Sequence, residues 1–409
     1  MVRTITPRLS ICLPSRNRQK YLKQAIIDIL NHDRDDFQLV IADNSTDPGI
    51  MNDFILPYLN DPRVCFLPSQ PTTLSMVDNW ERCVKSTTGD WVCIIGDDDY
   101  LDPDVIDVIG RIETSYADAD VVSWTRIAFN WPEQRPYHAN IVLQLGNGIH
   151  KVDRDYLHRA MFYWEGGAAI PNCPFCLYHG AVSRRALDAL LTRYGEPLFQ
   201  YPTMDYENTI KLQFVAKGFV YVDRPFSVLG VCPESNSAST GNVAETRQRY
   251  RAFLNEIGRD LDADPEMRGF PFSGELGVTA AIAQVQQWYK SKYNYMITNW
   301  ETSFAKACAR NCLFARDITE FKLIEEGYRA AFKIWDGGRH EPHFNPVWHE
   351  PDPNKSGLFT GYDDLKLFID ETIANVQTPQ EAYSVISDIA VPADMLELKF
   401  EPDRQTIRR

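Results

Sequence analysis

The segment Gly89-Asp90-Trp91-Val92-Cys93-Ile94-Ile95-Gly96-Asp97-Asp98-Asp99-Tyr100-Leu101-Asp102-Pro103 joins an apolar run to three adjacent aspartates. The run from Trp91 to Ile95 is typical of a buried strand, and the turn-forming residues after it predict that the strand ends there. A carboxylate cluster is costly to bury unless it is paired or binds a cation. At the carboxyl end of a parallel strand, the segment therefore predicts a crevice that holds a metal and its anionic ligand.

Three adjacent aspartates are also typical of a solvated acidic turn. The sequence Asp102-Pro103-Asp104 by itself is better explained as a helix start, where acidic side chains interact favourably with the helix dipole. The position of Asp97-Asp98-Asp99 directly after a buried strand favours the binding interpretation for these three residues.

Strand and helix patterns alternate through the first half of the chain. Strands are expected at 9–13, 37–42, 64–67, 91–95 and 120–124, and helices at 21–30, 50–59, 75–86 and 105–116. This alternation predicts an α/β fold with a doubly wound, mainly parallel sheet. The pattern loosens over 126–174, which predicts functional loops. It resumes with strands near 175–179 and 219–222 and helices at 184–193 and about 205–217.

Beyond residue 235 the composition changes. Ser, Asn, Thr and Gly dominate 235–242 and predict a linker. Residues 243–337 have mainly helical patterns, and two short helices are expected near 363–376 and 380–389. We therefore expect two domains, 1–237 and 238–409, of which the second is mainly α-helical.

Composition excludes several classes of protein. The 409 residues include 44% hydrophobic residues, and the formal net charge of −14 argues against broad binding of nucleic acid. Nine cysteines with scattered spacing and no signal peptide indicate free thiols in a reducing compartment. No apolar run approaches the roughly 18 residues of a membrane span. We expect a cytoplasmic protein, and contact with the inner face of the membrane is left open.

A second polar cluster follows the expected strand at 37–42. Asp43 with Asn44 and Ser45 is positioned to accept hydrogen bonds from a base or from ribose hydroxyls. The same composition also favours an Asx-turn. The Pro14-Ser15-Arg16-Asn17-Arg18 segment after the first strand is equally ambiguous when it is taken alone.

Together, these segments resemble the family 2 glycosyltransferases, inverting enzymes with a GT-A (Rossmann-like) fold. The resemblance runs from about residue 9 to residue 237. It is carried by Leu13-Pro14-Ser15-Arg16-Asn17-Arg18, Val40-Ile41-Ala42-Asp43-Asn44-Ser45-Thr46-Asp47, Asn79, Thr88-Gly89-Asp90-Trp91-Val92 and Gly96-Asp97-Asp98-Asp99-Tyr100-Leu101.

The resemblance implies a nucleotide-binding set with Asp43 at the base and Asp97 near the ribose. It implies Mn²⁺ or Mg²⁺ bound by the Asp-x-Asp-type motif Asp97-Asp98-Asp99. Two registers of that motif fit the family pattern, with either Asp98 or Asp99 as the metal ligand; we favour Asp98 and keep its neighbours as candidates. The full nucleotide-binding set is Pro14, Ser15, Asn17, Arg18, Asp43, Asn44, Ser45, Asn79 and Asp97.

Inverting transfer needs a base that removes the proton of the acceptor hydroxyl. The resemblance places this base at the start of a helix before the last core strand, where the sequence has Asp205-Tyr206-Glu207. Asp205 is the first candidate for the catalytic base and Glu207 the second. The alternative is that both acids only stabilise the first helical turn.

One position departs from the family pattern. Many members carry a His near the end of the core that completes the metal site, whereas this chain has Cys232 there. A thiolate is a poor ligand for a hard cation such as Mg²⁺. Either the site uses fewer protein ligands, or Glu234 or a C-terminal His replaces the missing ligand, and the identity of the metal is left open.

Three further patterns have ordinary structural explanations. Cys173 and Cys176 have zinc-ligand spacing but no second close pair, so buried thiols are the favoured interpretation. Histidines in the Pro-rich segment 336–361 are expected to be solvated. The aromatic series of the helical region is expected to be packing. The series includes Trp288, Tyr289, Tyr293, Tyr295, Trp300 and Phe304.

The resemblance implies transfer of a sugar from a nucleotide diphosphate donor, expected to be a UDP-sugar, to a hydroxyl of a glycan or lipid-linked acceptor. It also implies a role in bacterial surface polysaccharide or glycoconjugate synthesis. Loops from 126 to 174 would shape the acceptor pocket, and a homo-oligomer is left open. The alternatives are a nucleotidyltransferase, which would need a Gly-rich, Lys-containing loop that Pro14–Arg18 lacks, and a non-catalytic sugar-nucleotide-binding protein.

Overall fold

The computed structural model describes residues 6–134, 140–235, 242–258, 260–261, 263–350, 360–363, 365–370 and 375–399. Its central sheet has ten strands: β1 (Leu9–Ser15), β2 (Phe37–Asp43), β3 (Val64–Leu67), β4 (Trp91–Ile94), β5 (Tyr100–Leu101), β6 (Ala119–Asn130), β8 (Gly148–Val152), β9 (Gly180–Ser183), β10 (Gly218–Val231) and β13 (Glu397–Lys399). Their order is β13-β8-β10-β6-β9-β4-β1-β2-β3, and β5 pairs with β10.

Parallel pairing dominates the half of the sheet that begins the chain. Strand β1 pairs in parallel with both β2 and β4, and β2 pairs in parallel with β3. Strand β9 then runs antiparallel between β4 and β6, and β6 pairs in parallel with β10. The predicted α/β fold with a mainly parallel, doubly wound sheet is confirmed.

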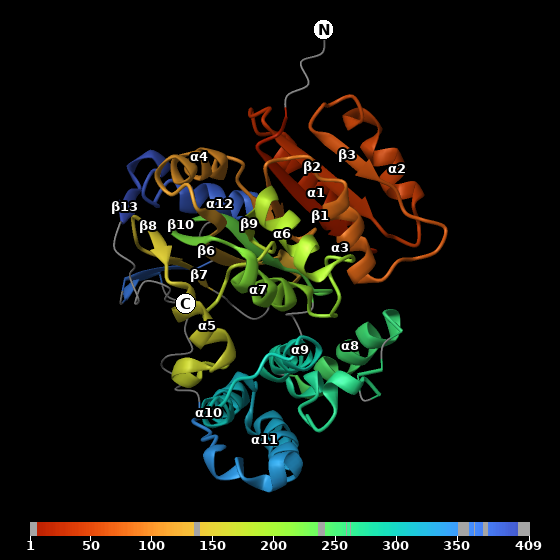
Figure 1. Ribbon diagram of the computed structural model, residues 1–409. Helices are drawn as coiled ribbons and strands as arrows, with labels where there is room; N and C mark the ends of the chain where they lie inside the picture. The colour runs from red at the N-terminus through yellow and green to blue at the C-terminus, as the bar shows by residue number, and fades with distance from the viewer. Residues whose placement is uncertain are drawn as a thin grey trace.

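Helices cover both faces of the sheet (Figure 1). On one face lie α3 (Met76–Lys85), α5 (Arg154–Phe162), α6 (Arg184–Tyr194) and α7 (Met204–Val215). On the other lie α1 (Gln19–Leu30), α2 (Gly49–Ile55), α4 (Val105–Ser115) and α12 (Pro379–Ser387). Strand β1 shows why two cores form: Leu9, Ile11 and Leu13 pack on the second face and Cys12 on the first, as the alternation of side chains along a strand requires.

A helical lobe follows the sheet in the chain. It contains α8 (Val243–Glu256), α9 (Val278–Lys292), α10 (Glu301–Asn311) and α11 (Ile318–Ile334), which lie together below the sheet in Figure 1. The expected helical region is confirmed. Trp288, Tyr289 and Phe304 are buried in a core continuous with one face of the sheet, so the aromatic series is packing, as predicted. No described helix has both the length and the apolar character needed to cross a membrane.

Two expected elements are wrong. The helix expected near 363–376 contains instead β11 (Gly361–Asp363) and β12 (Lys366–Asp370), which form a small sheet with β7 (Asn140–Gln144). The strand expected near 175–179 begins only at Gly180, with a single bridge between Ile94 and Tyr178 before it. In the first case β12 pairs with β11 directly before it and with β7, which lies more than 200 residues away in sequence; the pairing with β7 could not be seen in a local pattern.

The chain returns to the first domain after the helical lobe. Strand β13 pairs in parallel with β8, and α12 packs on the α1 face. The predicted division into 1–237 and 238–409 stays a prediction, because its boundary lies in 236–241, outside the described residues. Within the expected loop region 126–174, the described part contains the end of β6, then β7, β8 and α5.

Asp28 provides a test of how α12 docks on α1. Burial raises the pKa of Asp28 to about 6; a hydrogen bond from Gln24 (Nε2–Oδ1 2.8 Å) opposes this shift, and the negative charge of Glu381 on α12 adds to it. A carboxyl whose pKa is raised by folding stabilises the fold when protonated, and that stability is lost as the pH rises through about 6.

We therefore expect Asp28→Asn to raise the free energy of unfolding at pH 7.5 by about 1 kcal/mol. The gain should shrink as the pH falls to 4, where folded wild type already holds the proton. Thermal melts of both proteins from pH 4 to pH 8 measure this. A pH-independent difference between them would contradict the assignment.

Candidate donor-binding site

The site forms where β1, β2 and β4 end side by side. Ser15 at the end of β1 is in register with Asp43 at the end of β2. The aspartate loop Asp97-Asp98-Asp99 follows β4, which pairs with β1 on its other side. The sheet thus brings together the three sequence segments that the analysis singled out, because parallel strands place their carboxyl ends at one edge.

Asp97 is fully buried and is held by two residues of the first segment. Its Oδ2 accepts hydrogen bonds from Ser15 Oγ (2.6 Å) and Arg18 Nε (3.2 Å), and its Oδ1 lies 2.7 Å from Arg18 Nη2. Burial raises the pKa of Asp97 to about 7, with Arg18 acting against the shift and Asp98 adding to it.

Asp98 connects the aspartate loop to the segment after β10. Its Oδ2 accepts hydrogen bonds from Ser235 Oγ and from the backbone N–H of Cys232 (3.3 Å), and lies 3.4 Å from Arg18 Nη1. Its backbone carbonyl accepts from Trp131 Nε1 (2.9 Å). Burial, followed by the charge of Asp99, raises the pKa of Asp98. No described residue donates to Asp98 Oδ1.

Asp99 is held inside the protein by four donors. Its Oδ2 accepts from Gly96 N (2.6 Å), Tyr178 OH (3.1 Å) and His179 Nε2 (2.8 Å), and its Oδ1 accepts from Gly230 N (2.7 Å). Burial alone would raise the pKa of Asp99, but His179 and the backbone N–H groups outweigh it and lower that pKa. These contacts favour a structural role for Asp99 and leave Asp98 as the better metal candidate.

His179 is a site residue that the sequence analysis missed. Its side chain is fully buried, and its Nδ1 lies 2.8 Å from Ser227 Oγ, which accepts a hydrogen bond from Trp124 Nε1 (2.8 Å). His179 therefore links Ser227 to Asp99, with Nε2 at 2.8 Å from Asp99 Oδ2. Nothing in the local pattern around Tyr178-His179-Gly180 signals this role. Sequence reasoning looked for a His at 232 instead.

The second segment forms a tight polar loop. Asp43 is fully buried, and its carboxylate accepts from Ser45 Oγ (2.6 Å) and Ser69 Oγ (2.9 Å). Asn17, which adopts a left-handed conformation that Asn tolerates, accepts from Thr46 N (2.8 Å) and so joins the first loop to the second. The predicted Asx-turn is present at Asp43, where Ser45 N also donates to Oδ1 (3.2 Å).

The side chains of Asn44 and Asn79 support this loop through hydrogen bonds to the backbone. The side chain of Asn44 exchanges two hydrogen bonds with the backbone of Leu74 (2.8 and 2.9 Å). Asn79 on α3 donates to the carbonyl of Ala42 (3.0 Å) and accepts from Arg82 Nη2 (2.8 Å). Arg82 also donates to the carbonyl of Asp43 (2.7 Å). Asn79, on α3, therefore supports the end of β2.

The two candidate bases have different surroundings. Asp205 lies in the first turn of α7, where burial raises its pKa and Arg126 opposes the shift. Glu207 is almost completely buried, and its carboxylate accepts from the backbone of Gln200 and Tyr201 and pairs with Lys211 (2.6 Å). Glu207 therefore holds the segment that precedes Asp205.

Helix α8 of the helical lobe crosses the rim of the site. Arg249 donates to the carbonyls of Pro233 (3.1 Å) and Ser235 (2.5 Å). Glu256, at the other end of the helix, pairs with Arg16 (2.7 Å) and accepts from the backbone N–H of Met76 (2.8 Å). The lobe is thus tied both to the loop after β10 and to the loop after β1.

The donor set fits a divalent cation. Carboxylate oxygens are the ligands that Mg²⁺ and Mn²⁺ prefer, and Mg²⁺ is commonly held through one or two carboxylates together with substrate phosphates. Asp98 Oδ1 accepts no hydrogen bond from a described residue, but Oδ2 of the same carboxylate is paired with Arg18. Cys232 does not donate to the cation site as a His would, because its Sγ lies 3.6 Å from Arg18 Nη1 and burial raises its pKa to about 11.

A different group of potential metal ligands lies at the start of α4. Within the described ranges, His32, Asp102 and Asp104 are the only set of three or more such side chains whose donor atoms lie within 4.8 Å of one another. Asp102 Oδ2 already accepts from Tyr383 OH of α12 (2.5 Å), and Asp104 pairs with Arg34 (3.4 Å). These contacts tie α12 and α1 to the sheet.

The other cysteine and histidine patterns are structural. Cys173 accepts a hydrogen bond from Gln213 (3.6 Å) and Cys176 donates to the carbonyl of Tyr178 (3.4 Å); both residues are buried, and neither is in a disulfide. The expectation of buried thiols is confirmed. His340 pairs with Asp336 (3.3 Å) and packs on the Trp335 ring. Its side chain is buried, so the expectation of a solvated histidine is wrong at this position.

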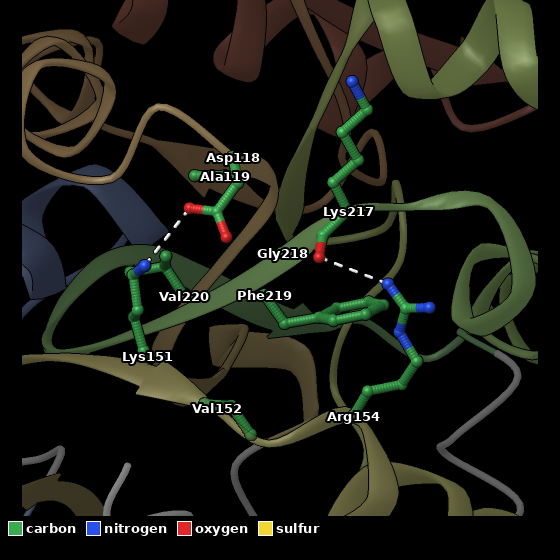
Figure 2. A pocket seen from close by; sticks show the side chains of 9 residues that line it. All are labelled: Asp118, Ala119, Lys151, Val152, Arg154, Lys217, Gly218, Phe219 and Val220. Carbon is green, nitrogen blue, oxygen red and sulfur yellow. Dashed lines mark hydrogen bonds and ion pairs between the residues drawn. The ribbon is translucent and has the colours of Figure 1, made fainter. Parts of the chain in front are cut away.

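A small pocket lies at the opposite end of the sheet (Figure 2). It adjoins Ala119 and Gly218, the first residues of β6 and β10, and its rim carries Lys151, Arg154 and Lys217. Its cavity of about 120 Å³ is well below the roughly 300–1,000 Å³ of a ligand pocket. Figure 2 shows Lys151 directed at Asp118, and Arg154 at the carbonyl of Lys217 (3.2 Å). This pocket is not the donor site.

The model of the glycosyl transferase family 2 matches residues 10–188, which include β1, β2, β4 and the aspartate loop. The predicted resemblance to the family 2 glycosyltransferases is confirmed over this part of the chain.

Several solved structures are distantly similar to this chain. TarS 1–349 from S. aureus is 15% identical, with a TM-score of 0.40, over 79% of this chain and 91% of that one. The same protein in complex with UDP-GlcNAc is 13% identical, with a TM-score of 0.42, over 82% and 89%. The mannosyltransferase PcManGT from Pyrobaculum calidifontis, in complex with GDP-Man and Mn²⁺, is 15% identical, with a TM-score of 0.37, over 83% and 86%.

Proposed function

We propose that this chain is an inverting glycosyltransferase that moves a sugar from a nucleotide diphosphate donor, a UDP-sugar, to a hydroxyl of a glycan or lipid-linked acceptor. The observation that carries the proposal is the meeting of Ser15, Asp43 and the aspartate loop at one edge of the sheet in a family 2 domain. The roles in bacterial surface polysaccharide synthesis and at the cytoplasmic face of the membrane rest on the resemblance alone.

The residues divide into a nucleoside end and a phosphate end. Asp43 accepts from the base, and the loops of Pro14–Arg18 and Asn44–Ser45 enclose it, with Asn79 bracing them. Asp97 lies toward the ribose. Asp98 would hold a divalent cation, and Asp99 fixes the loop. A bound Mn²⁺ or Mg²⁺ supplies positive charge that stabilises the leaving diphosphate.

On the acceptor side, one carboxylate is enough for inversion. Direct displacement needs a base that takes the proton of the attacking hydroxyl while the sugar carbon is attacked from the face opposite the diphosphate. Asp205 fills this role because, among the described residues, no basic side chain forms an ion pair with its carboxyl, whereas the carboxyl of Glu207 is paired with Lys211. Its raised pKa makes it a stronger base than an exposed aspartate.

Binding of UDP in the presence of Mn²⁺ tests the phosphate end. We expect Asp98→Asn to weaken Mn²⁺-dependent UDP binding at least tenfold in calorimetry, because the amide removes the charge that holds the cation. Asp104→Asn, at the other carboxylate cluster, should leave this binding within twofold of wild type. Unchanged binding in Asp98→Asn, or a loss in Asp104→Asn, would move the cation away from the aspartate loop.

A further inference from the structure

We propose that Arg18 is a resident counter-cation of the diphosphate site, which keeps a divalent cation away from Asp97 and Asp98 until a nucleotide diphosphate has entered. The inference rests on the proposed function, because it concerns the same site and deepens it by giving the order in which the cation and the donor are held.

The guanidinium of Arg18 spans the two carboxylates. Its Nη2 lies 2.7 Å from Asp97 Oδ1, its Nε donates to Asp97 Oδ2 (3.2 Å), and its Nη1 lies 3.4 Å from Asp98 Oδ2. The side chain of Arg18 is 24% exposed, whereas those of Asp97 and Asp98 are 0% and 5% exposed. Arg18 therefore lies between the buried carboxylates and the solvent from which a cation would arrive.

Charge balance explains why Arg18 stays there. Two adjacent buried carboxylates need compensation by opposite charge, and the serine hydroxyls that contact them carry none. Among the described residues, Arg18 is the basic side chain that pairs with both. An arginine guanidinium keeps its charge in proteins, so Arg18 supplies that opposite charge.

A cation that reaches Asp98 without a nucleotide meets the positive charge of Arg18 at close range. It also competes for carboxylates that are already paired. A diphosphate changes both conditions, because its oxygens match the planar fork of a guanidinium and offer it a new anionic partner. Arg18 then pairs with the diphosphate, and Asp98 becomes available to the cation. The expected order is the donor first, or the donor and the cation together.

The arrangement predicts different affinities for Mn²⁺ alone and Mn²⁺ with UDP. In titrations followed by the paramagnetic resonance signal of free Mn²⁺, wild type should bind the ion at least tenfold more tightly when UDP is present. Arg18→Gln and Arg18→Met should bind Mn²⁺ alone at least tenfold more tightly than wild type does. Both should bind UDP without metal at least tenfold more weakly. Arg18→Lys keeps the charge and should bind Mn²⁺ alone within threefold of wild type.

Arg16→Gln is the matched control. Arg16 lies two residues away in the same loop but pairs with Glu256 on α8, so its loss should leave the affinity for Mn²⁺ alone within twofold of wild type. Circular dichroism melts confirm that each variant is folded. If either Arg18→Gln or Arg18→Met does not fold, the other still tests the inference.

Two results would overturn the inference: equal Mn²⁺ affinity of wild type with and without UDP, or unchanged affinity for Mn²⁺ alone in both neutral variants. In each case the metal site itself would survive. Failure of the proposed function looks different, because Mn²⁺ would then bind to no variant even with UDP present, and the inference would fall with it.

Discussion

Asp205→Asn is expected to lower the transfer rate by about 100- to 10,000-fold, the usual contribution of a general base, while the affinity for UDP stays within twofold of wild type. The amide keeps the size of the side chain but cannot take a proton. Asp205 lies in the first turn of α7, outside the strand-end contacts that define the donor end. Product formation from a panel of UDP-sugars and acceptors, with UDP calorimetry alongside, measures both quantities.

Glu207→Gln is the informative comparison for Asp205. The carboxylate of Glu207 is about 1% exposed and pairs with the equally buried Lys211. Removing one partner of a buried pair costs about 3–5 kcal/mol, so we expect a large drop in the free energy of unfolding. The folded fraction should retain transfer. Retained turnover in Asp205→Asn together with its loss in folded Glu207→Gln would reverse the two roles.

Gly230→Ala is expected to disrupt the aspartate loop. A Cβ at position 230 would lie 1.7 Å from the carbonyl oxygen of Asp98, a backbone atom held by Trp131 Nε1 (2.9 Å). The N–H of Gly230 also donates to Asp99 (2.7 Å), so neither side can move without breaking contacts. We expect a loss of about 1–3 kcal/mol in stability, as in other overpacked sites, and at least tenfold weaker binding of UDP with Mn²⁺.

Gly110→Ala provides the control for this substitution. Gly110 lies inside α4, and a Cβ there would meet nothing within 4 Å. Replacing a helical glycine by alanine at a compatible position typically adds about 0.4–1 kcal/mol of stability. Thermal melts and UDP calorimetry on both variants separate the steric clash at position 230 from the general effect of adding a methyl group. Normal binding of UDP with Mn²⁺ in Gly230→Ala would show that the loop tolerates the shift.

Much of the fold could be predicted because its signals are local. The strand at 64–67 follows from an apolar run, and the structure has β3 there. The helix at 21–30 follows from the helical spacing of its apolar residues, and the structure has α1 there. The meeting of Ser15, Asp43 and Asp97 follows from one rule, that the carboxyl ends of parallel strands share an edge. These three residues belong to neighbouring strand ends, so their proximity needed no knowledge of side-chain contacts.

The rest depends on contacts between distant parts of the chain. The sequence left open whether Asp98 or Asp99 is the candidate metal ligand. What distinguishes them is that Asp99 accepts hydrogen bonds from Tyr178, His179 and the backbone of Gly230. The pairing of β12 with β7 is equally non-local. Cys232 is a third case. The family pattern has a metal-binding His at this position, but it did not indicate that the thiol of Cys232 would contact Arg18.

The return of the chain to the sheet has a consequence for synthesis on the ribosome. Strand β13, at 397–399, covers one side of β8, and α12 places Tyr383 against Asp102 on the α1 face. Until those residues leave the exit tunnel, β8 keeps an open edge of unpaired backbone groups, which is where sheets recruit foreign strands. A fragment that stops near residue 237 would lack β13 and would therefore retain that open edge of β8 permanently.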